Sequence, residues 1–145
     1  HRLAFQSCED LPRLPAEAGA LSFVAGRLEV GRAPLDAAKL GERRGLEFVV
    51  YRDNVNSLKA AVHRNTLQLG DGAAYYLHVV NAYTGTRPLQ LHVRRGAFRK
   101  RLDLGRTYRL SREEEIALTL SDGSQRLEMA FQPRRSHTYT VLLTG

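Results

Sequence analysis

The sequence predicts an all-β protein built from two small antiparallel β-sandwich modules. Two observations favour this fold class: short runs of alternating, β-branched or aromatic residues recur along the chain, and glycine, asparagine and aspartate separate these runs. No window of about ten residues carries a convincing helical stripe. The chain of 145 residues is long enough for one ordinary domain or two small ones with modest cores.

The elements are expected in the following order. Residues 1–19 contain Pro12 and Pro15 with little periodicity, so they are predicted to form an irregular N-terminal arm. Module 1 is placed at residues 20–73 and module 2 at residues 74–145. The predicted strands cover residues 20–25, 27–31, 46–51, 58–63, 66–69, 74–81, 88–94, 107–110, 115–120, 126–132 and 137–143.

The clearest hairpin is predicted between Glu115 and Phe131, with its turn at Asp122-Gly123. Apolar residues alternate on both sides of this turn, so one face of the hairpin is expected to meet a core and the other to meet water. The same alternation predicts a last strand over residues 137–143. The residues expected to point inward are Ile116, Leu118, Leu120, Leu127, Met129, Phe131, Tyr139, Val141 and Leu143.

An internal duplication is one explanation of the pattern. Residues 50–62 align with residues 119–131 without a gap, so that the turn and the following alternation coincide. Residues 75–80 also match the closing strand 138–143. The alternative is a single larger sandwich with no internal symmetry.

The charge pattern indicates an acidic partner. The chain has 22 basic and 15 acidic residues, which gives a formal charge of +7. Arginine binds carboxylates through two parallel hydrogen bonds, so a uronate polymer or an acidic protein surface is a natural ligand. No nucleic acid is expected, because a platform of interleaved aromatic residues is lacking. The alternative is that the charges protect a loop and an edge strand from aggregation. The candidate partner-binding residues are Arg94, Arg95, Arg99, Lys100 and Arg101.

Nothing in the sequence predicts an enzyme or a cofactor. It contains no nucleophile elbow, no His-Glu-x-x-His motif, no phosphate-binding glycine loop and no dinucleotide fingerprint. The acidic run 113–115 is expected to be a solvated edge, because neighbouring strand residues point to opposite faces. Cys8 is the single cysteine, which excludes an intrachain disulfide and a multi-cysteine zinc site. No apolar stretch approaches the roughly 20 residues that a membrane span needs.

Histidines offer one alternative chemistry. If residues 76–81 and 88–94 formed a hairpin centred on Gly85, His78 and His92 would lie directly opposite each other. His1, as a true mature N-terminus, would add an amine and a ring nitrogen, and such a set suits copper. Two histidines on a strand are more commonly residues of a polar face.

Tyrosines offer a second alternative, because an aromatic strip on a sandwich face can stack on sugar rings. The candidates are Tyr75, Tyr76, Tyr83 and Tyr139. The competing explanation is that these side chains are core or boundary residues with a hydrated hydroxyl.

The second half resembles a known family. Residues 76–81, 89–93, 116–124 and 138–145 contain a strand ending in asparagine, a leucine-rich hairpin with Asp-Gly-Ser, and a tyrosine-containing closing strand that ends in Thr-Gly. This pattern is similar to the module of the AlgF family, the periplasmic accessory proteins of alginate O-acetylation. The resemblance implies two successive β-sandwich modules and a non-catalytic adaptor that links membrane-bound and soluble acetyltransferase proteins during exopolysaccharide modification.

Three functions therefore stand side by side. The first is the periplasmic adaptor, for which the resemblance of the second half favours export. The start at His1 without an initiator methionine fits either a processed mature form or a trimmed chain whose signal segment has been removed. The second is a module that binds an acidic glycan directly. The third is an exported copper-binding protein that uses its N-terminal histidine.

Overall fold

The computed structural model describes residues 19–35, 44–52, 54, 56–68, 74–111 and 113–144. These residues form strands and turns without any helix, which confirms the all-β prediction. The described part therefore has no helix that could cross a membrane. Its strands are β1 (Ala20–Ala25), β2 (Leu28–Pro34), β3 (Arg44–Arg52), β4 (Ala60–Gln68), β5 (Tyr75–Ala82), β6 (Gln90–Arg95), β7 (Phe98–Leu102), β8 (Thr107–Leu110), β9 (Ile116–Ser121), β10 (Arg126–Phe131) and β11 (Thr138–Thr144).

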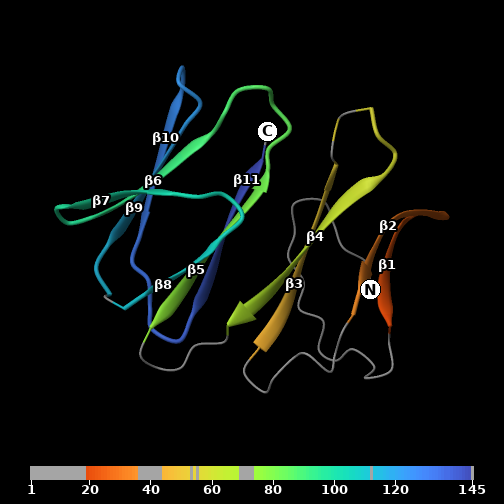
Figure 1. Cartoon of the computed structure of the whole chain (residues 1–145), viewed down its shortest axis with the longest axis horizontal. Coiled ribbons are helices and arrows are strands. Elements are labelled where there is room, and N and C mark those ends of the chain that lie inside the picture. Colours follow the sequence, from red (N-terminus) through yellow and green to blue (C-terminus); the bar gives the residue numbers. More distant parts are fainter. Residues whose placement is uncertain are drawn as a thin grey trace.

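The second half of the chain forms a two-sheet sandwich (Figure 1). One sheet has four strands in the order β10-β9-β6-β7, and the other has three in the order β11-β5-β8. All pairs are antiparallel except β11 and β5, which run parallel with Thr138 opposite Tyr76. The strands between β5 and β11 in sequence therefore provide the whole four-stranded sheet and one edge of the other sheet.

The main core lies between these two sheets. Strand residues alternate between faces, so every second residue of a strand reaches the core. The buried residues include Tyr75, Leu77, Val79, Leu91, Val93, Leu102, Ile116, Leu118 and Leu143. Burial of each such aliphatic side chain contributes about 1.5–3 kcal/mol, and the core therefore dominates the stability of this half.

β5 is buried on both faces, unlike every other strand in the described residues. Its residues Tyr75 to Val80 are at most 8% exposed. Leu77 and Val79 face the sandwich core, while Tyr76, His78 and Val80 face the opposite side. The β3–β4 hairpin lies against that opposite side, as Figure 1 shows by its place next to β5.

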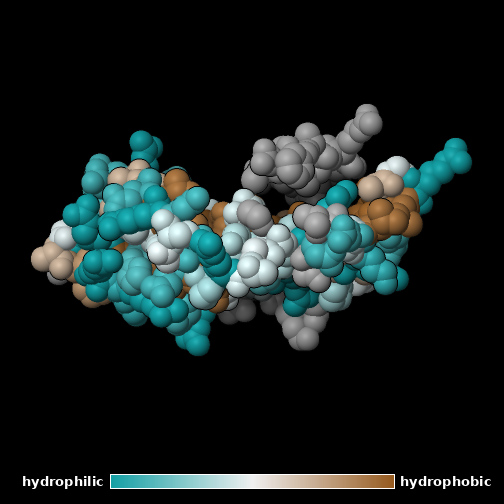
Figure 2. Space-filling model, turned by 90° about the horizontal axis from the view of Figure 1, so that it is seen from above, coloured by the Kyte–Doolittle hydropathy of each residue, from teal (hydrophilic) through white to brown (hydrophobic). Residues whose placement is uncertain are grey.

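The described part of the first half consists of two hairpins, β1–β2 and β3–β4. They pack on each other, with the Phe23 and Phe48 ring centroids 6.1 Å apart. At Gly31 a Cβ atom would lie 2.7 Å from Cγ2 of Val62, so the close approach of β2 to β4 requires glycine. Figure 2 shows hydrophobic surface at the end of the molecule that β1 and β2 form, where Val24 and Leu28 are exposed.

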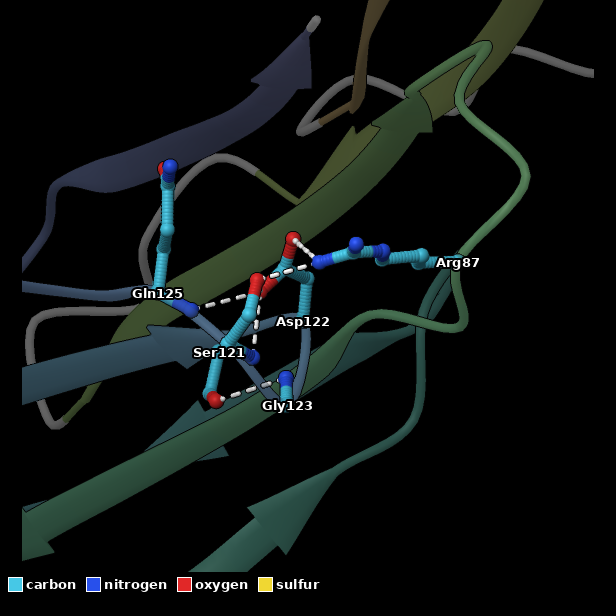
Figure 3. Close-up of polar contacts among 6 residues, drawn as sticks. Arg87, Ser121, Asp122, Gly123 and Gln125 are labelled. Atoms are coloured by element: carbon cyan, nitrogen blue, oxygen red, sulfur yellow. Dashed lines mark hydrogen bonds and ion pairs between the residues drawn. The ribbon is translucent and has the colours of Figure 1, made fainter.

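The predicted turn at Asp122-Gly123 is confirmed (Figure 3). The Asp122 carboxylate accepts hydrogen bonds from the backbone N–H groups of Gln125 at 2.7 Å and Ser124 at 2.9 Å. These bonds, with a smaller effect of Arg87 at 3.6 Å, lower the pKa of Asp122 to about 2. Gly123 has a positive φ of 90°, which favours glycine at this position.

The prediction that Leu127 and Met129 face a core is wrong. Leu127 is 70% and Met129 is 54% exposed. Both lie on β10, the edge strand of a four-stranded sheet that faces a three-stranded one. The smaller sheet does not cover this edge, so only Phe131 at the end of β10 is partly covered, by the Tyr139 ring at 5.1 Å. The inward orientation of Tyr139, Val141 and Leu143 is confirmed.

Most predicted strands appear near their expected positions, with two differences. Residues 58–63 and 66–69 were expected as separate strands, and residues 60–68 form the single strand β4. β7 was not predicted as a strand. The duplication stays a prediction: the two aligned segments are both hairpins, but the loop from Arg52 to Ala60 is longer than the loop from Ser121 to Arg126.

Candidate functional site

The β6–β7 hairpin presents a row of cations to solvent. In its register Arg94 lies opposite Arg99, and His92 lies opposite Arg101. These residues alternate with the buried Leu91, Val93 and Leu102, so they point away from the core. We call this surface, made by His92, Arg94, Arg99 and Arg101, the basic face.

The basic face has unbalanced charge. Like charges directly opposite each other destabilise a strand pair. No ion pair to Arg94, Arg99 or Arg101 occurs among residues 19–35, 44–52, 54, 56–68, 74–111 and 113–144. An anion bound between the arginines would relieve this repulsion, and the forked guanidinium groups suit a carboxylate.

The other two predicted partner-binding residues point to the opposite side of the hairpin. Arg95 lies with its guanidinium 5.8 Å from the Phe98 ring centroid and 3.7 Å from a Glu114 carboxylate oxygen. The Lys100 ammonium lies 5.8 Å from the Tyr108 ring centroid. The structure therefore brings together three of the five predicted residues and assigns Arg95 and Lys100 to contacts within the fold.

An open hollow borders the basic face. It has a volume of about 360 Å³ and is lined by Arg94, Gly96, Glu114, Glu115 and Ala117. The acidic residues of the run 113–115 are exposed, as expected, and Glu113 pairs with Arg135 at 3.8 Å. The hollow therefore has mixed charge, and the cationic surface ends at Arg94.

The proposed hairpin that would pair His78 with His92 does not exist. β5 pairs with β11 and β8, whereas β6 pairs with β7 and β9. His78 and His92 are therefore in different sheets and cannot form a cross-strand metal site. His1, the third member of the copper hypothesis, lies outside the described residues. No group of three potential metal ligands occurs within the described ranges.

His78 has a different neighbour. It is 2% exposed, and its Nδ1 lies 2.7 Å from Oγ1 of Thr107. Its ring stacks on His63 of β4 with centroids 6.1 Å apart and an angle of 24° between the planes. Burial lowers the pKa of His78, Glu47 opposes this effect, and His63 adds to it. The two rings therefore form a packing contact between β4 and β5.

Further polar groups surround His78 where the β3–β4 hairpin covers β5. The Thr140 hydroxyl donates to a Glu47 carboxylate oxygen at 2.6 Å. The other Glu47 oxygen, the Asn65 amide nitrogen and the His78 Nε2 are buried without a hydrogen-bond partner. The sequence interpretation missed this cluster. One signal was available, because His78 is the single polar residue within the apolar run from Tyr75 to Val80.

The tyrosines do not form a sugar-stacking strip. Tyr75 is fully buried and Tyr76 is 8% exposed. The Tyr139 ring packs against Phe131 and meets the Tyr75 ring edge-on at 6.2 Å. Burial raises the pKa of Tyr75, and the nearby Arg95 opposes this effect. Tyr75, Tyr76 and Tyr139 are therefore core or boundary residues, and Tyr83 is half-buried directly after β5. This leaves the basic face as the candidate site.

The basic face consists of three exposed arginines, Arg94, Arg99 and Arg101, and the half-buried His92. Guanidinium groups arranged in this way can hold a carboxylate or another anion. Comparisons with protein-family models, with curated proteins and with solved structures found no match to this chain.

Proposed function

We propose that this chain is a non-catalytic adaptor that binds an acidic protein surface through the basic face. The observation that carries this proposal is the cross-strand pair of Arg94 and Arg99, with Arg101 next to them on the same face of the hairpin. Such an arrangement costs stability in the free protein, and a carboxylate-bearing partner offsets that cost. The strands beneath hold the arginines at fixed spacing, so little order has to be gained on binding.

The resemblance of residues 74–145 to the AlgF module suggests the setting. We place the chain in the periplasm, in the O-acetylation of an alginate-like exopolysaccharide. Its partners there would be membrane-bound and soluble acetyltransferase proteins. The seven-stranded sandwich of the second half is compatible with that kind of module.

The test compares two double variants with the same change in net charge. Arg99→Glu with Arg101→Glu reverses the basic face, and Arg27→Glu with Arg32→Glu reverses two exposed arginines of the β1–β2 hairpin. Binding to purified acetyltransferase proteins and to poly-glutamate is measured by calorimetry. We expect the first variant to bind at least about tenfold more weakly and the second to bind like the unmodified chain. An equal loss of affinity in both variants would show a general effect of net charge and would contradict the proposal.

A second candidate is direct binding of an acidic glycan, because a uronate carboxylate fits the same arginines. Uronate oligomers and poly-glutamate of equal charge separate the two functions. Tighter binding of the uronate oligomers, lost on reversal of the basic face, favours the glycan. Tighter binding of poly-glutamate or of the acetyltransferase proteins favours the adaptor.

A further inference from the structure

The two edges of the four-stranded sheet differ in charge. β7 has the sequence Phe-Arg-Lys-Arg-Leu, with three adjacent cations, and β10 has the sequence Arg-Leu-Glu-Met-Ala-Phe, with one charge of each sign. A second copy of the chain would be repelled at β7. At β10 the charges cancel, so this edge offers no such repulsion.

β10 also lacks the other features that protect an edge strand. It pairs with β9 in an unbroken register from Arg126 to Phe131, without a bulge or a proline. Two of its apolar side chains, Leu127 and Met129, are 70% and 54% exposed. No described strand pairs with its free side. A regular edge with exposed apolar side chains and no net charge favours the addition of another strand.

The turn shows which backbone groups of β10 are free. The Asp122 N–H donates to the Gln125 carbonyl at 3.3 Å, so these two residues form a hydrogen-bonded pair. Such pairs alternate along an antiparallel ladder. With Leu127 opposite Leu120 in the register, the N–H and C=O groups of Leu127 face β9, and those of Arg126 and Glu128 face away from it.

We propose that the free edge of β10 pairs antiparallel with β10 of a second copy, centred on Leu127. This register places Arg126 of each copy opposite Glu128 of the other and Leu127 opposite Leu127. Centring on Arg126 or on Glu128 would place like charges opposite each other, and centring on Met129 would pair no opposite charges. Within one copy Arg126 and Glu128 form an ion pair with each other. In the Leu127 register each of them also lies opposite its counter-charge on the other copy, so charge complementarity selects this register and a symmetric dimer.

The dimer has a consequence for binding. Cross-strand partners share a face, so the two four-stranded sheets join into one sheet with both basic faces on the same side. Two linked sites bind a repeating polyanion or a dimeric acidic partner more tightly than one. The dimer itself does not depend on the proposed function, because β10 contributes no residue to the basic face.

The test is a charge swap followed by sedimentation equilibrium over about a hundredfold range of protein concentration. Arg126→Glu and Glu128→Arg, made singly, each place like charges opposite each other. We expect either variant to weaken dimerisation by at least about fivefold. The double variant with both changes restores opposite charges and should dimerise like the unmodified chain.

The matched control is Arg32→Glu, which makes the same charge change as Arg126→Glu on an exposed strand residue of β2. It should leave dimerisation unchanged. The Arg126 and Glu128 side chains are 61% and 58% exposed, so the variants should keep the fold. Circular dichroism checks that they do. A chain that stays monomeric at every concentration, or a double variant that fails to recover, would overturn the proposal.

Discussion

Two strands of this protein carry the same tripeptide, Leu-His-Val, in opposite environments. In β5 it is Leu77-His78-Val79 and in β6 it is Leu91-His92-Val93. The leucine and valine are buried in the same core in both strands. The histidines differ: His78 is 2% exposed beneath the β3–β4 hairpin, and His92 lies on the basic face beside Arg101.

Whether the outer face of a strand is buried or exposed depends on whether a further hairpin packs against it. Alternation alone turns both histidines away from the core. The β3–β4 hairpin then converts one outer face into an interior with buried polar groups, while the other outer face stays free to bind an anion. We therefore expect His92 of β6 to contribute to binding and His78 of β5 to contribute to stability.

The largest expected loss of stability concerns the buried leucine that the two tripeptides share. Leu77→Ala and Leu91→Ala should each lower the free energy of unfolding by about 2–5 kcal/mol, because each leaves a cavity in the core. Leu58→Ala is the control, since Leu58 is 76% exposed, and it should change stability by less than about 0.5 kcal/mol. Urea unfolding measures all three. A small effect of Leu77→Ala alone would mean that β5 is not central to the fold.

The next largest loss of stability concerns the histidine, whose burial differs between the two tripeptides. His78→Gln should lower the free energy of unfolding by about 1–3 kcal/mol, because it disturbs the contact with Thr107 and the packing on His63. His92→Gln should change it by less than about 0.5 kcal/mol. Equal effects of the two substitutions in urea unfolding would show that the β3–β4 hairpin does not cover β5.

Elements marked by a pattern of residues close in sequence could be predicted, and elements recognisable mainly by their pairing with another strand could not. The Asp122-Gly123 hairpin was predictable because its turn residues and alternation are local. β7 was not, because Arg99, Lys100 and Arg101 interrupt any apolar pattern and the strand is recognisable mainly by its pairing with β6. The parallel pairing of β11 with β5 joins segments far apart in sequence, so no local pattern predicts it.

The candidate site was predictable in composition and not in geometry. The density of arginine after Val93 is visible in the sequence. The turn at Gly96 then decides which residues share a face, with Arg95 opposite Phe98 and Arg94 opposite Arg99. For His78 the sequence offers one signal, its place as the single polar residue in an apolar run, whereas the cover over its side chain depends on how the β3–β4 hairpin packs.

A smaller expected effect is a change in how the free energy of unfolding depends on pH. Burial lowers the pKa of His78 from the ordinary value of 6.5, so in the folded state this residue binds a proton less readily than in the unfolded state. As the pH falls below about 6.5, the unfolded state takes up this proton first, and the free energy of unfolding decreases until the pH reaches the folded pKa. Unfolding of the unmodified chain and of His78→Gln is compared between about pH 5 and pH 8. The variant should lose this part of the pH dependence, and an unchanged pH dependence would contradict the burial of His78.

The most direct test of the whole account follows the two histidine rings by NMR during a titration with poly-glutamate. His92 lies on the basic face and His78 lies beneath the β3–β4 hairpin, so each ring reports on one environment. We predict that the His92 ring signals and the Arg94, Arg99 and Arg101 side-chain signals shift together, with His78 unchanged. Shifts that gather on His78 and leave His92 unmoved would contradict the claim that this protein binds its partner through the outer face of β6 and β7.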